Sequence, residues 1–218
     1  MDHVCIFIDG SNFYHALKEA NLPVDINFAE LAAALVGPER RHMQTFYHNT
    51  PLVRPAPGDP DYDARESRYR RQQNLFNALR YVPNLTLKLG RFQRIRGEGQ
   101  EAVCPSYGHS FQLAGTATFV EKSVDVMLAT DVLLHATKNH YDVAVLISSD
   151  ADYKHAVEKA KLEFNKAVEL RQIESARCYD LTSVGSRYEP ITGDLIRSCS
   201  RPWATRRPLR VPAWSRGF

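Results

Sequence analysis

Two short, almost continuous apolar runs constrain the fold of this chain more than any other feature of its sequence. The first run is His3–Asp9 (HVCIFID), and the second is Asp142–Ile147 (DVAVLI), with Asp150 three residues further on. Short runs that are apolar on both faces are typical of parallel strands covered by helices on each side. Both runs are therefore predicted to be buried strands, each followed by an aspartate at its carboxyl end.

Around these runs, strand and helix patterns alternate along the chain. Further strands are predicted at Met43–His48, Leu85–Leu89 and Ala167–Leu170. Helices are predicted at Asn12–Ala20, Asn27–Val36, Ala64–Tyr81, Lys122–His135, Tyr153–Leu162 and Tyr188–Cys199. A proline-rich loop is expected at Pro51–Asp61, and a hairpin or loop at Phe92–Val103. The alternation predicts an α/β fold, a three-layer α/β/α sandwich with a mostly parallel central sheet.

The length of 218 residues suits one such domain, which we expect to span residues 1–199. Residues 200–218 form a basic tail with prolines, arginines and tryptophans, which is predicted to be flexible. No apolar run approaches the roughly 20 residues that cross a bilayer, so no membrane partner is expected. Scattered cysteines and the lack of a signal-like N-terminus predict a cytoplasmic protein, and an oligomer is compatible with the sequence.

The charge of the chain is unevenly distributed, although its net value is only +3. Residues 65–96 contain nine basic residues and one acid, and residues 201–218 contain five arginines and no acid. Such segments indicate a polyanionic partner; the alternative is a solvated helix face and a tail without a role. The arginines expected to contact RNA are Arg65, Arg68, Arg71, Arg91 and Arg94.

Aromatic residues interleave with these arginines and favour a single-stranded partner. Tyr69, Tyr81 and Phe92 lie within the basic segment, where cationic side chains would attract phosphates and aromatic rings would stack on bases. The alternative is partial burial of the tyrosines against the sheet, and this is the outcome we expect for Tyr81.

Three aspartates are predicted to meet at one edge of the sheet. Asp9 and Asp150 follow the two apolar strands, and Asp125 lies near the start of a helix, where the helix dipole tolerates an acid. Carboxylates that converge in this way need a divalent cation, and oxygen ligands select Mg²⁺ or Mn²⁺. Such an ion can activate water and stabilise charge on a phosphodiester. The alternative for each aspartate is an ordinary turn or capping residue.

Three sequence blocks follow one another at these strand and helix ends: Phe7–Tyr14 (FIDGSNFY), Glu121–Asp131 (EKSVDVMLATD) and Ile147–Tyr153 (ISSDADY). They resemble the signature blocks of the NYN domain, a PIN-like nuclease group that includes LabA-like bacterial proteins. The pattern of that family is D-G-x-N after a strand, then K-G-V-D-x-x-L-x-x-D, then S-G-D-x-D-F. The resemblance extends over about residues 3 to 197 and includes the predicted last helix.

The resemblance implies a metal-dependent ribonuclease of RNA processing or decay, with Mg²⁺ or Mn²⁺ as cofactor and RNA as partner. It implies that Asp9, Asp125 and Asp150 form the catalytic carboxylate core and hold the ion. It also implies that Asp152 is a fourth metal ligand and that Asn12 orients water or a phosphate.

Four further residues are expected to support this site. Ser148 and Ser149 would donate hydrogen bonds to the carboxylates or to the substrate. Lys122 would contact a phosphate or pair with an acid, unless it is an ordinary surface lysine. Asp131 lies six residues after Asp125 and is turned about 120° from it on a helix, so it is given a supporting role; the alternative is an exposed or capping acid.

The chain departs from the family pattern at three positions. Ser123 and Ser149 stand where the family has glycines, and Tyr153 replaces phenylalanine, a change that we expect to be conservative. A serine alters loop geometry wherever the backbone needs a positive φ. Two other functions therefore stay open: a non-catalytic RNA-binding or regulatory scaffold on the same fold, and a receiver-like domain phosphorylated on Asp9 or Asp150.

Overall fold

The computed structural model describes residues 1–96, 101–103, 110–112 and 117–200; those of them that lie between 92 and 122 are described by their backbone only. The centre of the molecule is a six-stranded sheet with the order β10-β9-β8-β1-β2-β3, in which all neighbouring strands are parallel. Its strands are β1 (His3–Asp9), β2 (Arg41–Asn49), β3 (Leu85–Leu89), β8 (Val143–Ile147), β9 (Ala167–Arg171) and β10 (Arg187–Tyr188).

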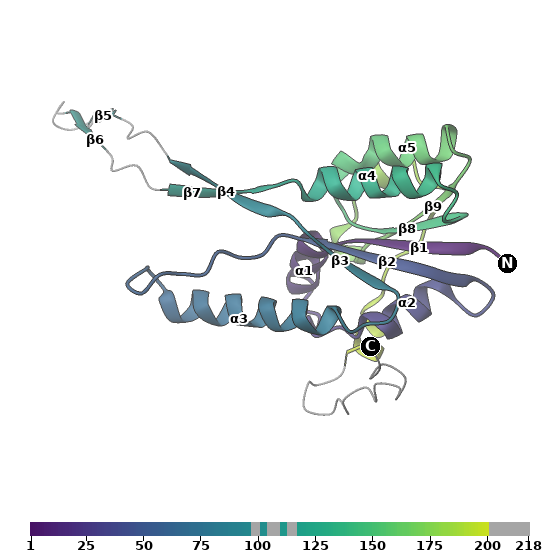
Figure 1. Cartoon of the computed structure of the whole chain (residues 1–218), viewed down its shortest axis with the longest axis horizontal. Helices are drawn as coiled ribbons and strands as arrows, with labels where there is room; N and C mark the ends of the chain where they lie inside the picture. The colour runs from purple at the N-terminus through teal and green to yellow at the C-terminus, as the bar shows by residue number, and fades with distance from the viewer. Residues whose placement is uncertain (97–100, 104–109, 113–116, 201–218) are drawn as a thin grey trace, which may run out of the picture.

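Helices cover both faces of this sheet, as Figure 1 shows. One face is covered by α1 (Gly10–Glu19), α2 (Phe28–Val36), α3 (Tyr62–Leu79) and α7 (Gly193–Ser198). The other is covered by α4 (Val124–Thr137), η1 (Ala151–Tyr153), α5 (Lys154–Leu162) and α6 (Tyr179–Thr182), and a further short turn is η2 (Glu174–Ala176). The predicted three-layer α/β/α sandwich with a parallel sheet is confirmed.

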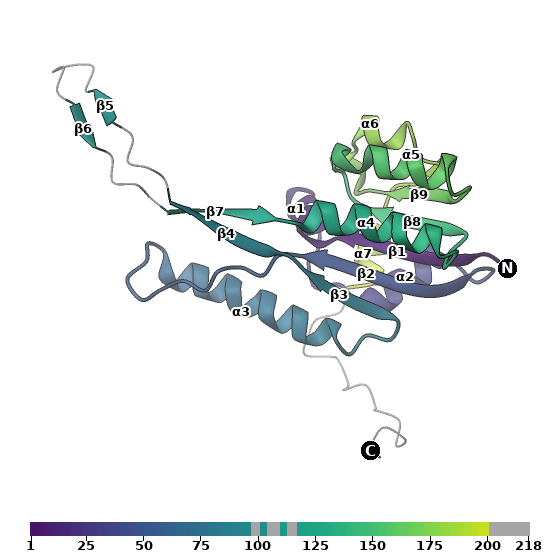
Figure 2. The same ribbon diagram turned by 45° about the horizontal axis from the view of Figure 1, so that its top comes forward.

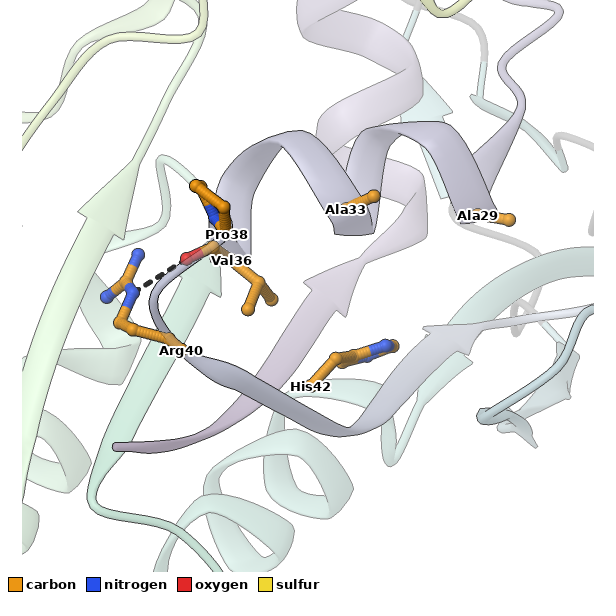
Figure 3. A pocket seen from close by; sticks show the side chains of 7 residues that line it. Ala29, Ala33, Val36, Pro38, Arg40 and His42 are labelled. Atoms are coloured by element: carbon orange, nitrogen blue, oxygen red, sulfur yellow. Dashed lines mark hydrogen bonds between the residues drawn. The ribbon is translucent and has the colours of Figure 1, made fainter. Parts of the chain in front are cut away.

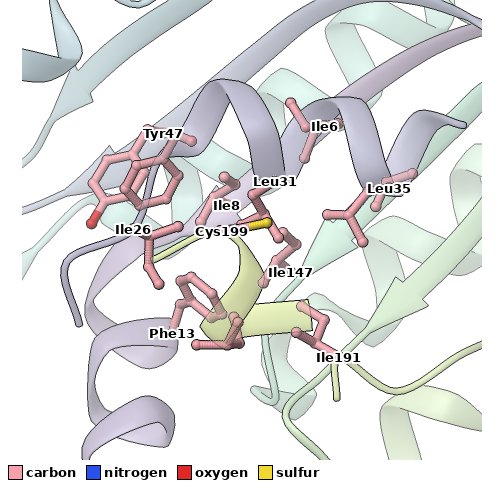
Figure 4. Packing of buried hydrophobic residues seen from close by; sticks show 14 of the residues in the cluster. Ile6, Ile8, Phe13, Ile26, Leu31, Leu35, Tyr47, Ile147, Ile191 and Cys199 are labelled. Carbon is pink, nitrogen blue, oxygen red and sulfur yellow. The ribbon is translucent and has the colours of Figure 1, made fainter. Parts of the chain in front are cut away.

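Strand β1 shows why its sequence is apolar without interruption. Ile6 and Ile8 pack with Phe13 of α1 in the core of one face (Figure 4), whereas Phe7 packs with Leu128 of α4 in the core of the other. Successive side chains of a strand point to opposite faces, and here both faces are covered. Each such fully buried side chain contributes about 1.5–3 kcal/mol to folding.

A hairpin leaves the sheet after β3 and returns at the start of α4. Strands β4 (Arg91–Arg96) and β7 (Ala117–Lys122) pair antiparallel, and so do β5 (Glu101–Val103) and β6 (Ser110–Gln112). Figures 1 and 2 show β4 and β7 extending away from the body of the molecule. The predicted hairpin at Phe92–Val103 is thus only part of a longer excursion, and residues 201–218 of the predicted tail lie outside the described residues.

The predicted last helix, Tyr188–Cys199, is wrong in its first half. Residues Arg187–Tyr188 form β10, Ile191 makes an isolated bridge to Ile173, and α7 begins only at Gly193. Pro190 explains the difference, because it has no amide hydrogen and disfavours helical backbone at the residue before it. The helix instead begins after Thr192, whose hydroxyl accepts a hydrogen bond from the Leu195 amide at 3.3 Å.

The order of the strands defines where a functional site is expected. From β1 the chain proceeds outward through β2 and β3 on one side, and later from β8 through β9 and β10 on the other. The direction of winding therefore changes between β1 and β8, and ligands of such sheets bind outside the carboxyl ends of the strands at this point. No helix in the described part of the chain is long and apolar enough to span a bilayer.

Candidate metal centre

Three aspartates lie together where the winding of the sheet changes. Asp9 is the last residue of β1, Asp150 follows β8, and Asp125 is in the first turn of α4. One carboxylate oxygen from each lies within 4.8 Å of the other two. The convergence expected from the sequence is therefore present in the structure.

Local hydrogen bonds hold two of these carboxylates. Asp9 is the N-cap of α1, and its Oδ1 accepts a hydrogen bond from the Asn12 amide at 3.0 Å. Asp150 is the N-cap of η1 and accepts one from the Asp152 amide at 3.0 Å. Each carboxylate has a second oxygen, so the same aspartate can cap its helix with one oxygen and face the cluster with the other. The capping alternative and the ligand hypothesis are both consistent with this geometry.

Gly10 is required by the close approach of α1 to β2. A Cβ atom at this position would overlap the ring of Tyr47, and Tyr47 is itself buried in the core. The ring cannot move aside cheaply, because buried side chains are closely packed. Glycine is therefore the residue type that fits at position 10, directly after Asp9, because it has no Cβ atom.

Tyr153 is the main residue of the site that sequence reasoning missed. Its hydroxyl lies 3.0 Å from Asp9 Oδ2 and 3.0 Å from Asp125 Oδ1, and the side chain is buried. Burial and the two neighbouring carboxylates raise the pKa of Tyr153, so it acts as a hydrogen-bond donor to them. Replacing the phenylalanine of the family pattern with tyrosine is therefore not a conservative change here.

The charge of the cluster is not balanced by any described side chain. Asp9 is 4% exposed, and this burial raises its pKa to about 6. The carboxylates of Asp125 and Asp150 raise the pKa further, whereas hydrogen bonds from the Asn12 backbone amide and the Tyr153 hydroxyl lower it. None of the three carboxylates forms an ion pair with a lysine, arginine or histidine whose side chain the structure describes. Three close carboxylate oxygens without a protein cation fit a hard divalent ion such as Mg²⁺ or Mn²⁺.

The predicted serines and Asn12 link the ends of β1 and β8. Ser148 Oγ lies 3.4 Å from Asp9 Oδ2 and accepts a hydrogen bond from the Asp150 amide at 3.1 Å. The Ser149 amide donates to Asn12 Oδ1 at 2.9 Å. These contacts connect the loop that carries Asp150 to the end of β1 and to α1, and so they fix the position of Asp150 relative to Asp9. The roles of Asn12, Ser148 and Ser149 toward water or substrate stay predictions.

Gln172 supports this loop from β9 and was not singled out in the sequence. Its Nε2 donates to the Ser148 carbonyl at 2.9 Å, and its Oε1 accepts from the Cys178 amide at 3.0 Å. The side chain is buried, so both groups need these partners. A lone glutamine after a strand carries no sequence signal that predicts this role.

Asp131 lies outside the three-carboxylate cluster. Its Oδ2 is 2.9 Å from His48 Nε2 and 3.5 Å from Lys88 Nζ, and Asp131 and His48 are buried. The side chain of Asp152 is exposed and is likewise not part of the cluster. The ligand role of Asp152 and the supporting role of Asp131 stay predictions.

The basic segment is divided between the two ends of the sheet. The 18 residues of α3 span about 27 Å, whereas the five residues of β3 span about 17 Å, so the first half of α3 extends past the carboxyl end of β3 (Figure 1). Arg65 and Arg68 lie in this half, and Arg71 follows directly after it. Tyr81 precedes β3 at the amino end and is 78% exposed, so the expectation that it packs against the sheet is wrong.

The predicted RNA-binding arginines differ in their surroundings. Arg65 pairs with Asp59 at 3.3 Å. Arg68, Arg71 and Arg91 are exposed and form no ion pair with the described side chains. The side chains of Arg94 and Lys122 lie outside the described residues.

A separate hollow of about 450 Å³ opens between α2 and the start of β2, at the amino ends of the strands (Figure 3). Ala29, Ala33 and Val36 line it together with Arg40 and His42. Arg40 is engaged, because its Nε donates to the Val36 carbonyl at 2.7 Å and its Nη1 pairs with Glu169 at 2.8 Å. This hollow therefore offers no free cation to an anionic ligand and is remote from the carboxylates.

Comparisons with known proteins agree with this geometry. No curated protein matches the chain. The crystal structure of a protein of unknown function from Vibrio parahaemolyticus is similar, with a TM-score of 0.56 and 17% identity, covering 87% of this chain and 93% of that one; this likeness shows the fold alone. The model of the NYN domain family matches residues 3–185. The chain therefore belongs to the NYN domain family and has the PIN-like fold of its nucleases.

Proposed function

We propose that this protein is a ribonuclease that depends on Mg²⁺ or Mn²⁺ and acts in RNA processing or decay. The observation that carries the proposal is the cluster of Asp9, Asp125 and Asp150, which lies at the switch point of the sheet without a described protein cation. These three residues would hold the ion. Membership of a nuclease family supports the same conclusion.

The residues around the cluster have defined tasks in this proposal. A bound divalent ion supplies Lewis-acid chemistry, by lowering the pKa of water and neutralising charge on the phosphodiester. The backbone amide of Asn12 and the hydroxyl of Tyr153 each donate a hydrogen bond to one oxygen of Asp9. The Ser148 hydroxyl contacts Asp9 and accepts a hydrogen bond from the Asp150 amide, so it connects Asp9 to the loop that carries Asp150. Held in this way, the carboxylates need little rearrangement to bind a cation.

Single-stranded RNA is the proposed substrate. Arg68, Arg71 and Arg91 are exposed cations without described partners. Arg68 lies on the part of α3 that extends past the carboxyl end of β3, and Arg71 is about one turn further along the helix. They are suited to phosphates in sequence-independent contacts. A cytoplasmic location is part of the same proposal, and it is supported by the free thiols of Cys5, Cys178 and Cys199.

The proposal is tested by substituting Asp9→Asn and Asp150→Asn. Each variant should lose metal-stimulated cleavage of single-stranded RNA by at least about 100-fold, because a carboxylate ligand is lost. A suitable control is Asp194→Asn, which removes an exposed carboxylate paired only with Arg197 on α7. Gel assays across Mg²⁺ and Mn²⁺ concentrations measure cleavage, and circular dichroism verifies folding. Full activity in both folded cluster variants would reject the mechanism.

A non-catalytic RNA-binding scaffold is the second candidate, and two observations favour it. Ser123 adopts a φ of +83° where the family has glycine, and the Tyr153 hydroxyl lies between two carboxylates where the family has phenylalanine. Both departures alter the surroundings of Asp125. Salt-sensitive RNA binding without metal-stimulated cleavage of any RNA in a varied panel would support the scaffold and reject the enzyme.

A further inference from the structure

A stacked group of side chains follows β9 and reaches β10. The guanidinium carbon of Arg177 lies 4.5 Å from the ring centre of Tyr179 and 4.2 Å from that of Tyr188. Tyr179 is 71% exposed, so a large aromatic ring is open to solvent. Arg177 forms no ion pair with a described side chain, so both its charge and the open part of the Tyr179 ring face solvent.

This group is tied to the loop that carries Asp150. Gln172 joins the Ser148 carbonyl to the amide of Cys178, the residue directly before Tyr179. Helix α6, which begins at Tyr179, also contacts η1, the turn that follows Asp150. In Figure 2, α6 lies beside α5, whereas α3 lies on the opposite side of the sheet. The helix that carries Tyr179 and the helix that carries the basic residues therefore cover opposite faces of the sheet.

The chemistry of the group suits a nucleobase better than a phosphate. An aromatic ring stacks on any base, and a guanidinium over the ring adds a cation–π interaction that supports the platform. A phosphate alone would meet the exposed acids Glu174 and Asp180, which lie in the same short segment. The ring of Tyr179 is therefore suited to contact the base of a nucleotide and not its phosphate.

We propose that Tyr179, supported by Arg177 and Tyr188, is a base-stacking platform for single-stranded RNA. It holds a nucleotide of the same strand whose phosphodiester lies at Asp9, Asp125 and Asp150. This inference rests on the proposed function and adds a subsite to it. Because stacking is strongest for large bases, the platform favours a purine at this position.

The test measures binding without cleavage. Fluorescence anisotropy follows a labelled ten-nucleotide oligoadenylate, with EDTA present, bound to the full chain and to Tyr179→Ala, Tyr179→Phe and Tyr81→Ala. Tyr179→Ala should weaken binding at least about fivefold and reduce the preference for oligoadenylate over oligouridylate. Tyr179→Phe keeps the ring and should stay within about twofold of the unsubstituted protein. Tyr81→Ala, an equally exposed tyrosine at the amino ends of the strands, should also stay within about twofold.

Three outcomes would overturn the platform: unchanged binding by Tyr179→Ala, equal losses in Tyr179→Ala and Tyr179→Phe, or no measurable binding by the unsubstituted protein. A separate assay with Mg²⁺ or Mn²⁺ tests cleavage. Failure of the proposed function would appear as absent cleavage with the Tyr179 binding effect intact. Failure of the platform would appear as cleavage that Asp150→Asn abolishes and Tyr179→Ala does not change.

Discussion

Helix α4 carries two aspartates that face the sheet in opposite electrostatic surroundings. Asp125 lies with Asp9 and Asp150, and none of the three pairs with a described cation. Asp131, less than two turns further along, contacts His48 at 2.9 Å and Lys88 at 3.5 Å. The comparison shows how one helix supports two kinds of site. A carboxylate that is held by a histidine hydrogen bond and a lysine is structural, whereas carboxylates without such partners are free to bind an exchangeable cation.

The register of the sheet produces this difference. Asp9, His48 and Lys88 are paired neighbours on β1, β2 and β3, and so they form a polar row across three adjacent strands. The part of α4 over β1 therefore meets an acid, and the part over β2 and β3 meets a histidine and a lysine. Burial lowers the pKa of His48, although the hydrogen bond to Asp131 opposes this.

The largest expected effect separates Asp125→Asn from Asp131→Asn. Asp125→Asn should reduce metal-dependent cleavage at least about 100-fold and change the unfolding free energy little, because it removes one of three repelling carboxylates. Asp131→Asn should keep most of the activity and lose about 1–3 kcal/mol of stability, because His48 and Lys88 lose a charged partner. Urea denaturation and cleavage assays on the same samples measure both properties.

The distinction between the two aspartates would fail if Asp131→Asn lost cleavage as completely as Asp125→Asn while staying folded. Metal-induced shifts in the melting temperature provide a readout that is independent of activity. They should persist in Asp131→Asn and disappear in Asp125→Asn, since only a cation bound to the folded state stabilises it.

A smaller effect is expected for Tyr153→Phe. The variant should lose about 1–3 kcal/mol of stability without metal, because Asp9 and Asp125 lose their shared hydrogen-bond donor. Added Mg²⁺ or Mn²⁺ should then raise its melting temperature more than that of the unsubstituted protein. The matched control is Tyr141→Phe, which removes a buried hydroxyl that donates to the Val132 carbonyl of α4 at 2.9 Å.

Tyr141→Phe should lose comparable stability but keep the ordinary metal-induced shift, since its hydroxyl does not touch the carboxylates. Equal metal-induced shifts in the two tyrosine variants would show that the Tyr153 hydroxyl does not influence cation binding at the cluster.

The smallest expected effect concerns Ser123, which precedes α4. Its φ of +83° lies in the left-handed region, so Ser123→Gly should stabilise the protein by about 0.5–1 kcal/mol. Asn165→Gly is the control, because asparagine already tolerates its φ of +50° and should gain less. Urea denaturation measures both. A loss of stability in Ser123→Gly would show that the serine side chain has a stabilising contact that outweighs the backbone strain.

Much of the fold and the centre of the site follow from local sequence patterns. The apolar runs before Asp9 and after Asp142 predict buried parallel strands, and the structure has β1 and β8 there with both faces covered. The carboxyl ends of parallel strands meet at one edge, so the proximity of Asp9 and Asp150 is predictable too. The predicted start of the last helix is wrong because Pro190 and the short pairing of β10 outweigh a weak helical pattern.

The layers of this protein, the end of the sheet that carries the acids and the basic segment are all predictable from the amino-acid sequence, because periodicity and charge are local properties. The folded arrangement was needed to show that Tyr153 bridges two carboxylates, that His48 and Lys88 contact Asp131, and that α6 contacts the turn after Asp150. These contacts join residues far apart in the chain. They depend on strand register and helix position, which no short stretch of sequence encodes.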